Sequence, residues 1–330
     1  MFSKKDNTIE NPIGGQALIE GVMMRGKDAY SIALLKKSGE ISVTKIAHKS
    51  IGERYKIFKT PFIRGIGALW DSLKIGIKSL MFSANEAIKE EEEINPPKKK
   101  KKNKKGDTTL GVLLSVVSII FAFLLFVAVP NVLIHLIGIN ETSDPVIFNI
   151  LSGIMRILIF VAYVFAISLM NDIKRVFQFH GAEHKAVNAY EAGKPVEMDT
   201  VKTFTTFHPR CGTSFMLFVL VIAIFVFSFV PIFYRSVIPG FANFHIVINK
   251  AIIILTHFAL LPVVAGISYE LIKLTYKGRN NIFLKIIALP GYGLQKITTR
   301  EPDENQLKCA IAAINELLKK DDDKKDEEAA

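Results

Sequence analysis

The chain has 330 residues, of which 50% are hydrophobic and 10% aromatic, and its mean hydropathy is +0.30. This composition argues against an intrinsically disordered protein and against an ordinary soluble enzyme. The formal net charge is +11, but seven of these charges are lysines between positions 98 and 105, which leaves +4 for the rest of the chain. No basic helix with interleaved aromatic residues remains, so we expect no nucleic-acid partner. The two cysteines, Cys211 and Cys309, exclude a disulfide scaffold but leave one bridge open, and their number fits reduced thiols on a cytoplasmic face.

Residues 1–60 are expected to form a small N-terminal part with a β-hairpin. Residues 14–26 are dense in glycine and contain the polar residue Glu20, a further candidate site residue, within an apolar stretch. We expect them to form a loop that folds back onto the region of His180 and Cys211. Residues 30–35 and 40–46 alternate between apolar and polar side chains on either side of a short turn, which predicts the hairpin.

An amphipathic helix is predicted over residues 61–94. Its apolar positions recur at helical spacing, and they are Ile66, Leu69, Trp70, Leu73, Ile77, Leu80 and Met81. Such a helix can lie on the cytoplasmic leaflet of a membrane or pack against the hairpin and the spans. Residues 95–108 form a linker rich in proline and lysine. Its lysines from Lys98 to Lys105 are expected either to contact anionic lipid, at about 1 kcal/mol each near the surface, or to form a solvated tether.

Four stretches have the roughly 20 apolar residues that a helix needs to cross a bilayer: residues 110–129, 146–170, 214–234 and 246–271. The expected fold class is therefore an α-helical multi-pass membrane protein with four transmembrane helices and a small N-terminal α+β cytoplasmic part. The spans are grouped as residues 109–171 and 213–272. They flank a cytoplasmic loop, residues 172–212, and precede a helical C-terminal segment, residues 273–320, and a charged disordered tail, residues 321–330.

The lysines and arginines of the loops predict the orientation. Residues 131–145 contain none and residues 235–245 contain one, whereas residues 171–212 and 273–300 contain six each. Positive residues concentrate in cytoplasmic loops. We therefore expect a cell-membrane protein with both termini in the cytoplasm.

The motif His180-Gly-Ala-Glu183-His184 lies in the loop between the second and third spans. On a helix, residues four apart share a face, so both imidazoles can bind one divalent ion, with zinc the expected metal. Glu183 would then be the catalytic general base. The alternative is a set of solvated surface groups, and Gly181 weakens the helix by about 1 kcal/mol relative to alanine.

A second cluster, His208-Pro-Arg210-Cys211, directly precedes the third span. His208 and Cys211 are candidate further ligands or a nucleophile and its base, and Arg210 is a candidate for holding an anionic substrate group. A membrane-entry turn is the alternative. Glu270, at the cytoplasmic end of the fourth span, competes with His208 as the third ligand, and Glu191 is a further candidate.

Over roughly residues 11–318 the chain resembles the YqhQ-type family of bacterial membrane proteins, and five segments carry the resemblance. They are the glycine-rich segment at residues 14–26, the segments around the two histidine motifs (residues 179–185 and 208–215), Tyr269-Glu270, and residues 290–302. This family is a domain of unknown function described as predicted metal-dependent enzymes. The resemblance implies a multi-pass membrane protein and favours a metal site, but it supplies neither a substrate nor a reaction.

The leading functional hypothesis is a metal-dependent hydrolase at the cytoplasmic membrane surface. The alternatives are a non-catalytic scaffold or assembly factor that recruits protein partners, whose identity the sequence does not give, and a small transporter that uses Arg156 and His257. The substrate, the metal and the remaining ligands stay open.

Overall fold

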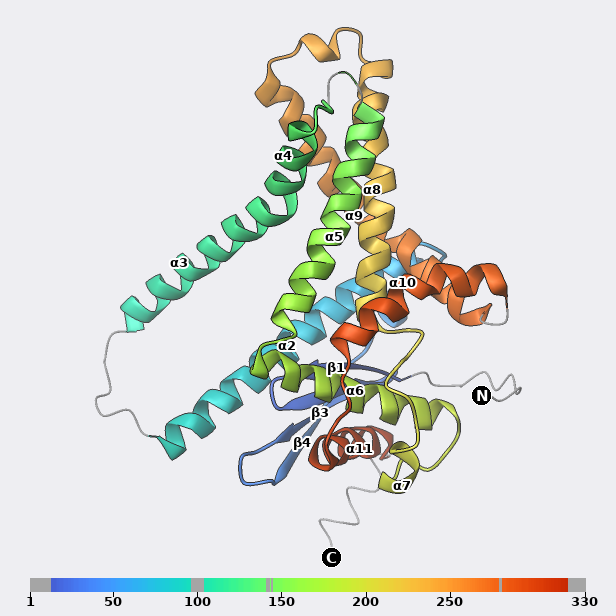
Figure 1. Ribbon diagram of the computed structural model, residues 1–330. Coiled ribbons are helices and arrows are strands. Elements are labelled where there is room, and N and C mark those ends of the chain that lie inside the picture. The colour runs from blue at the N-terminus through green and yellow to red at the C-terminus, as the bar shows by residue number, and fades with distance from the viewer. Residues whose placement is uncertain (1–12, 96–103, 141–142, 144, 279–280, 320–330) are drawn as a thin grey trace, which may run out of the picture.

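The computed structural model describes the whole chain except residues 1–12, 96–103, 141–142, 144, 279–280 and 320–330. Most of the long apolar helices stand upright above a small unit that combines a sheet with helices, and α3 (Lys104–Phe123) slants away from them (Figure 1). The small unit is built from both ends of the chain and from the segment between the second and third long helices. Its sheet and its flanking helices position the candidate site.

The sheet is an antiparallel meander of four strands, in the order β1-β2-β3-β4. The strands are β1 (Gly14–Leu18), β2 (Gly21–Arg25), β3 (Ala29–Leu35) and β4 (Ile41–Ala47). The predicted hairpin of residues 30–35 and 40–46 is confirmed as β3 and β4. The glycine-rich segment, expected as a loop, is instead the hairpin β1–β2. Its β2 is buried on both faces, and a strand buried in this way lacks the alternation by which strands are recognised.

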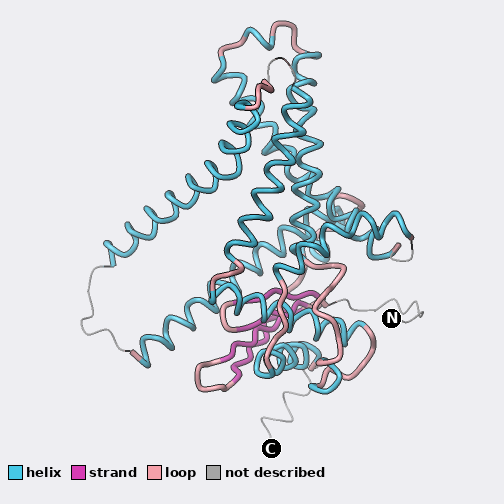
Figure 2. The backbone as a smooth tube through the Cα atoms, in the orientation of Figure 1, coloured by secondary structure: helices cyan, strands magenta, loops and turns pink. Residues whose placement is uncertain are grey.

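Helices cover both faces of the sheet (Figure 2). On one face, α6 (Asn171–Glu191) and α11 (Glu304–Leu318) enclose the larger core, which includes Val22, Phe179 and Ile314. On the other face, Ile75 of α2 (Ile63–Ile94) packs with Leu18, Met23, Ile32 and their neighbours. The sheet is thus the middle layer of the unit, and α6 carries the first histidine motif directly against it.

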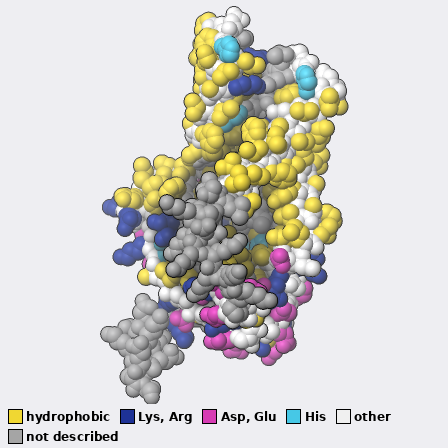
Figure 3. Space-filling model, turned by 90° about the vertical axis from the view of Figure 1, so that its left-hand side faces the viewer, with side chains coloured by type: hydrophobic (Ala, Val, Ile, Leu, Met, Phe, Trp, Pro, Cys, Tyr) yellow, Lys and Arg dark blue, Asp and Glu magenta, His cyan; other side chains and the backbone are white. Residues whose placement is uncertain are grey.

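Four long apolar helical stretches follow the predicted spans. The first combines α3 (Lys104–Phe123), a π-helical segment η2 (Leu124–Ala128) and α4 (Val129–Leu136). The others are α5 (Pro145–Ile167), α8 (Gly212–Val237) and α9 (Ile246–Lys277). Each contains a stretch long and apolar enough to cross a membrane: Leu113–Leu136, Val146–Ile167, Gly212–Val237 and Ile246–Lys277. Hydrophobic side chains dominate the upper part of the molecule, and charged ones gather in the lower part (Figure 3).

Shorter elements connect these parts: α1 (Ile51–Arg54), η1 (Lys56–Lys59), α7 (Met198–Val201), η3 (Phe241–Asn243) and α10 (Ile282–Thr298). The predicted amphipathic helix of residues 61–94 is confirmed as α2. The predicted linker of residues 95–108 is shorter, because α3 already begins at Lys104. Most of the lysine segment and all of the predicted disordered tail lie outside the described residues, so the expected lipid contact stays a prediction.

Candidate metal centre

Helix α6 brings His180 and His184 to the same face, one turn apart, with ring centroids 4.4 Å from each other. Between them, Gly181 lies against the backbone of Arg300, just beyond the end of α10. A Cβ at position 181 would stand 2.0 Å from the Arg300 carbonyl oxygen. The glycine that weakens the helix in isolation is therefore required by this close approach of two backbones.

Both imidazoles are oriented by backbone carbonyl groups. His180 Nδ1 donates to the carbonyl oxygen of Thr298 at 2.8 Å, and His184 Nδ1 donates to that of Thr206. A proton fixed on Nδ1 leaves the lone pair of Nε2 free to bind a metal. Metal-binding histidines commonly have this outer hydrogen bond, which sets their tautomer and their orientation.

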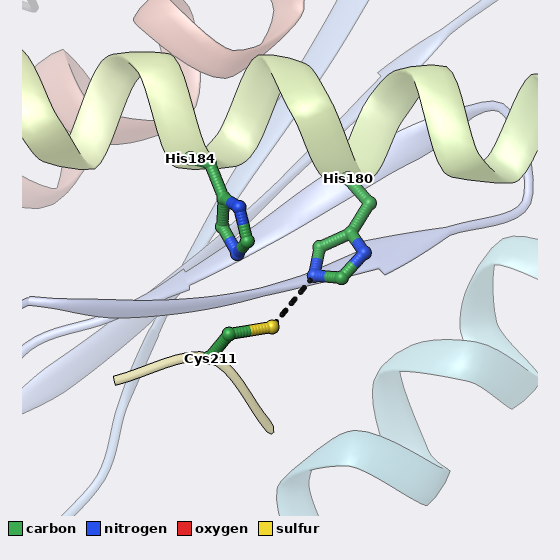
Figure 4. A group of neighbouring side chains, drawn as sticks. All are labelled: His180, His184 and Cys211. Carbon is green, nitrogen blue, oxygen red and sulfur yellow. Dashed lines mark hydrogen bonds between the residues drawn. The ribbon is translucent and has the colours of Figure 1, made fainter. Parts of the chain in front are cut away.

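Cys211 completes the group from the opposite side (Figure 4). Its Sγ lies 3.3 Å from His180 Nε2, and one ligand atom from each of His180, His184 and Cys211 lies within 4.8 Å of the others. The ligand atoms of a tetrahedral zinc site stand about 3.3–3.6 Å apart, as bonds of about 2.0–2.3 Å require. The observed group thus needs only a small contraction to fit one ion.

The loop that carries Cys211 is fixed by a buried glutamine from α10. Gln295 accepts from the His208 backbone N–H and donates to the His208 carbonyl oxygen, both at 2.9 Å, and it donates to Ser214 Oγ at 2.8 Å. These three bonds tie the segment before α8 to α10 on either side of Cys211. Because α10 also ends at Thr298, whose carbonyl oxygen orients His180, this one helix positions His180 on one side of the ligand cluster and the segment of Cys211 on the other.

Burial and local interactions shift the ionisation of His184 and Cys211. Burial lowers the pKa of His184, which favours the neutral, metal-binding form of the imidazole. For Cys211, burial opposes ionisation, but the hydrogen bonds and charge interactions with His184 and Thr213 outweigh it and lower the pKa of the thiol. A thiolate and neutral imidazoles are the forms that bind metals, so the donor set fits a zinc ion.

Glu183 lies beside this group and is buried. Its Oε2 is 3.6 Å from His184 Nε2, and burial raises the pKa of the carboxyl group. The glycine-rich hairpin encloses the side chain, because a Cβ at Gly15 would stand 2.4 Å from Glu183 Cγ and Oε1. The expectation that residues 14–26 fold back onto the histidine motif is therefore met at Gly15, by a strand rather than by a loop.

His208, expected to compete for the third ligand position, makes other contacts. Its Nε2 is 3.4 Å from Glu191 Oε2, and its Nδ1 accepts from the Arg210 backbone N–H at 3.3 Å. Arg210 forms an ion pair with Glu191 and lies over the ring of Tyr276, 4.9 Å from its centroid. Both ring nitrogens of His208 are thus occupied, although its ring lies only 5.6 Å from that of His184.

Two further candidates are held elsewhere by arginines. Glu270 is bound by both arms of the Arg64 guanidinium group, with 2.6 Å between Arg64 Nε and Glu270 Oε1. Glu20 makes the corresponding paired contact with Arg175, 2.6 Å from Nη2 to Oε2. The structure therefore brings His180, His184, Cys211 and Glu183 together and gives His208, Glu191 and Arg210 to a neighbouring cluster.

Sequence reasoning missed Gln295, which fixes the segment of Cys211, and the close contact of Gly15 with the Glu183 side chain. Gln295 is the only uncharged polar side chain between Pro290 and Lys296 apart from Tyr292, and such a glutamine in an apolar helix is a signal of a buried hydrogen-bonding role. The carbonyl groups of Thr206 and Thr298 have no such signal, because any residue type supplies the same backbone acceptor.

Comparison with known proteins gives a family without an assigned activity. Residues 60–320 match the family model DUF1385, described as a protein of unknown function. The chain is 33% identical over 326 residues to the uncharacterized protein YqhQ of Bacillus subtilis (strain 168), an alignment that covers 93% of this chain and 92% of that protein. No solved structure matches it. The family match and the extent of the similarity to YqhQ show that the chain belongs to the DUF1385 family.

Proposed function

We propose that this protein is a metal-dependent hydrolase in which His180, His184 and Cys211 hold a divalent ion, with zinc the expected metal. The observation that carries the proposal is the pair of imidazoles whose Nδ1 atoms are bound by backbone carbonyls and whose Nε2 atoms lie near one thiol. Three protein ligands that leave a fourth position open are typical of catalytic zinc sites, whereas structural sites have four. When bound, such an ion supplies Lewis-acid chemistry to a water molecule or to a substrate oxygen.

Glu183 is the proton carrier in this proposal. Hydrolysis forms a bond between a water oxygen and the electrophilic atom of the substrate and breaks the bond to the leaving group. Glu183 Oε2 accepts the proton of the water and then delivers it to the leaving group. A carboxyl group whose pKa is raised by burial suits both steps, because it exchanges a proton at a lower energetic cost near neutral pH.

The proposed location is the cell membrane, with four spans and both termini in the cytoplasm. The four long apolar helices and the concentration of lysine and arginine in the segments at one end support it. The metal centre, which directly precedes α8, then lies at the cytoplasmic surface, and anionic lipids are the proposed partners of the lysines from Lys98 to Lys105. Alkaline phosphatase inserted at Gly240 is expected to be active, and the same enzyme inserted at Gly193 is expected to be inactive. The reverse pattern would contradict the orientation.

A second candidate is a cysteine hydrolase. The Cys211 thiol contacts His180 Nε2 at 3.3 Å, and its pKa is lowered, both of which suit a thiolate nucleophile with a histidine base. The thiolate would form a covalent bond to the substrate and release the leaving group, and water would then cleave that bond. This candidate requires no metal, so metal content separates it from the first.

Metal analysis of the full chain, purified in detergent, tests the proposal. We expect about one zinc per chain, a loss of the zinc in the variants His180→Ala, His184→Ala and Cys211→Ser, and its retention in Glu183→Gln. Cys309→Ser and Glu270→Gln are matched controls and are expected to keep the zinc, because Cys309 lies in the larger core and Glu270 is bound by Arg64. Zinc at background level in the unmodified protein would contradict the metal centre and leave the cysteine hydrolase or a scaffold.

A further inference from the structure

Helix α2 buries mainly small residues and exposes most of its large apolar ones. Its buried positions are Gly65, Gly67, Asp71, Ile75, Gly76, Ser79 and Ser83. The exposed side includes Trp70, Leu73, Ile77 and Met81, of which Trp70 is 63% and Met81 is 61% exposed. A helix that packs in water has the opposite arrangement, with its apolar side against the core. This surface therefore requires an apolar environment that the described part of the chain does not provide.

The close contacts of α2 place its start near the inner boundary of the proposed bilayer. A Cβ at Gly65 would stand 3.1 Å from Gly266 Cα of α9, and a Cβ at Gly266 would stand 2.9 Å from the Phe62 carbonyl oxygen. Gly266 is 20 residues beyond Ile246, where α9 begins, which corresponds to about 30 Å of helix. This equals the thickness of the hydrocarbon core, about 30 Å. Residues 62–65 therefore lie where the hydrocarbon core meets the headgroups.

Helix α10 also has an exposed apolar side, and it lies at a depth similar to that of the start of α2. Its first half exposes Ile282, Phe283, Ile286 and Leu289, of which Phe283 is 72% exposed. Its second half approaches α8, because a Cβ at Gly291 would stand 2.7 Å from Ser214 Oγ. Ser214 is 23 residues from Val237, where α8 ends, or about 35 Å along the helix. With a core of about 30 Å, this position falls in the headgroup layer.

We propose that the first two-thirds of α2, which carries Trp70 and Met81, and the first half of α10 lie in the cytoplasmic leaflet at the boundary of headgroups and acyl chains, with their exposed apolar residues in contact with lipid. The acidic end of α2 lies outside the leaflet, where Glu90 and Glu91 contact Lys37 of the β3–β4 turn. The inference rests on the proposed membrane location.

The basic residues beside the apolar face of α2 agree with this placement, because Lys74 and Lys78 are exposed there and can reach anionic headgroups. The glutamates of α2 lie beyond this face, at Glu86 and at Glu90–Glu93. Both helices lie across the foot of the upright helices, where a leaflet surface would be (Figure 1). A second copy of the chain would need to cover two separate helices, whereas one leaflet covers both.

Trp70 provides a direct test, because it is the single tryptophan of the chain and belongs to the exposed face. The full chain is reconstituted into vesicles of zwitterionic and anionic lipid, with either ordinary acyl chains or chains brominated near the carbonyl end. We expect the brominated lipid to remove about half or more of the Trp70 fluorescence, since such a helix buries its apolar face by about 5–10 Å. Trp70 fluorescence that is equal in both kinds of vesicle would overturn the proposal.

Two control variants separate this failure from failure of the membrane location. Trp70→Phe combined with Phe229→Trp places the probe on the exposed surface of α8, and strong quenching of it is expected. Trp70→Phe combined with Lys308→Trp places it on the exposed side of α11, where no quenching is expected. Quenching at position 229 without quenching of Trp70 would refute the inference alone, and crosslinking between chains through α2 in that case would identify a second copy as the occupant. No quenching at position 229 would refute the membrane location itself.

For α10, the variant Trp70→Phe combined with Phe283→Trp moves the probe to its exposed half. Quenching comparable to that of Trp70 is expected if both helices lie at one depth. Quenching of Trp70 together with an unquenched probe at position 283 would overturn the proposal for α10.

Discussion

Substitution of Gly181 by alanine tests whether the close approach of α6 to the end of α10 builds the site. The new Cβ would stand 2.0 Å from the Arg300 carbonyl oxygen, and ordinary contact begins at 3.4 Å, so the two backbones must separate by about 1.4 Å. That movement stretches the hydrogen bond from Arg300 N to Phe177 O, at 2.9 Å, and the bond from His180 Nδ1 to Thr298 O, at 2.8 Å.

The free energy of unfolding is expected to fall by about 2 kcal/mol in Gly181→Ala. Steric overpacking costs about 1–3 kcal/mol, and the two hydrogen bonds, weakened rather than broken, together cost about 1 kcal/mol. The gain in helix propensity returns about 1 kcal/mol. The assays are the thermal midpoint in detergent, expected to fall by roughly 4–8 °C, and the zinc content, expected to fall because His180 loses its orientation.

Gly293→Ala is the matched control, because it also lies within a helix near the site but has nothing within 4 Å of its added Cβ. We expect this variant to keep both the thermal midpoint and the zinc content. If Gly181→Ala behaves like Gly293→Ala, the reasoning about the backbone contact is refuted.

Three further predictions concern residues around the site and the core. Gln295→Ala removes the three hydrogen bonds that fix the segment before α8 and leaves buried backbone groups unpaired, at a cost of about 1–3 kcal/mol each. We therefore expect a lower thermal midpoint and a faster reaction of Cys211 with a maleimide. Unchanged values for both would contradict the role of Gln295. Burial raises the pKa of the Cys309 thiol to about 12, so the thiol stays neutral in the folded chain, whereas in the unfolded chain it ionises above about pH 9. The free energy of unfolding therefore has its full value below about pH 9 and falls by about 1.4 kcal/mol per pH unit above it. Thermal midpoints between pH 8 and pH 10 should therefore decline more steeply in the unmodified protein than in Cys309→Ala, and parallel curves would refute this. Gly15→Ala displaces the Glu183 side chain without contacting a proposed metal ligand. The variant should therefore keep its zinc but lose the hydrolase activity. Loss of the zinc would contradict the separate role of Glu183.

The long helices, and the common face of the two histidines on any helix, could be predicted because their signals are local, whereas α6 itself lies in a segment expected as a loop. Runs of apolar residues define the four long stretches, and the spacing of His180 and His184 places both side chains on one face wherever the segment is helical. The amphipathic pattern likewise predicted α2. It left open which side packs, because the choice of small residues as the packing side depends on close contacts such as that of Gly76 with Gln16.

The membership of the site could not be predicted because it depends on contacts between distant segments. Cys211, His208, Glu191 and Glu270 all had suitable chemistry for a third ligand. The structure separates them through partners far away in the chain: Arg64 binds Glu270, and Gln295 fixes the backbone of His208. Spacing along the sequence contains no information about such partners, and the role of Gly181 depends in the same way on the carbonyl group of Arg300.

X-ray absorption at the zinc edge of the purified full chain tests the central claim most directly, namely that His180, His184 and Cys211 share one ion. We expect two nitrogen ligands at about 2.0–2.1 Å, one sulfur ligand at about 2.3 Å and one further light atom. In Cys211→Ser the sulfur contribution should disappear, whereas in Cys309→Ser the spectrum should stay unchanged. A spectrum without sulfur in the unmodified protein, or with sulfur that persists in Cys211→Ser, would contradict this centre.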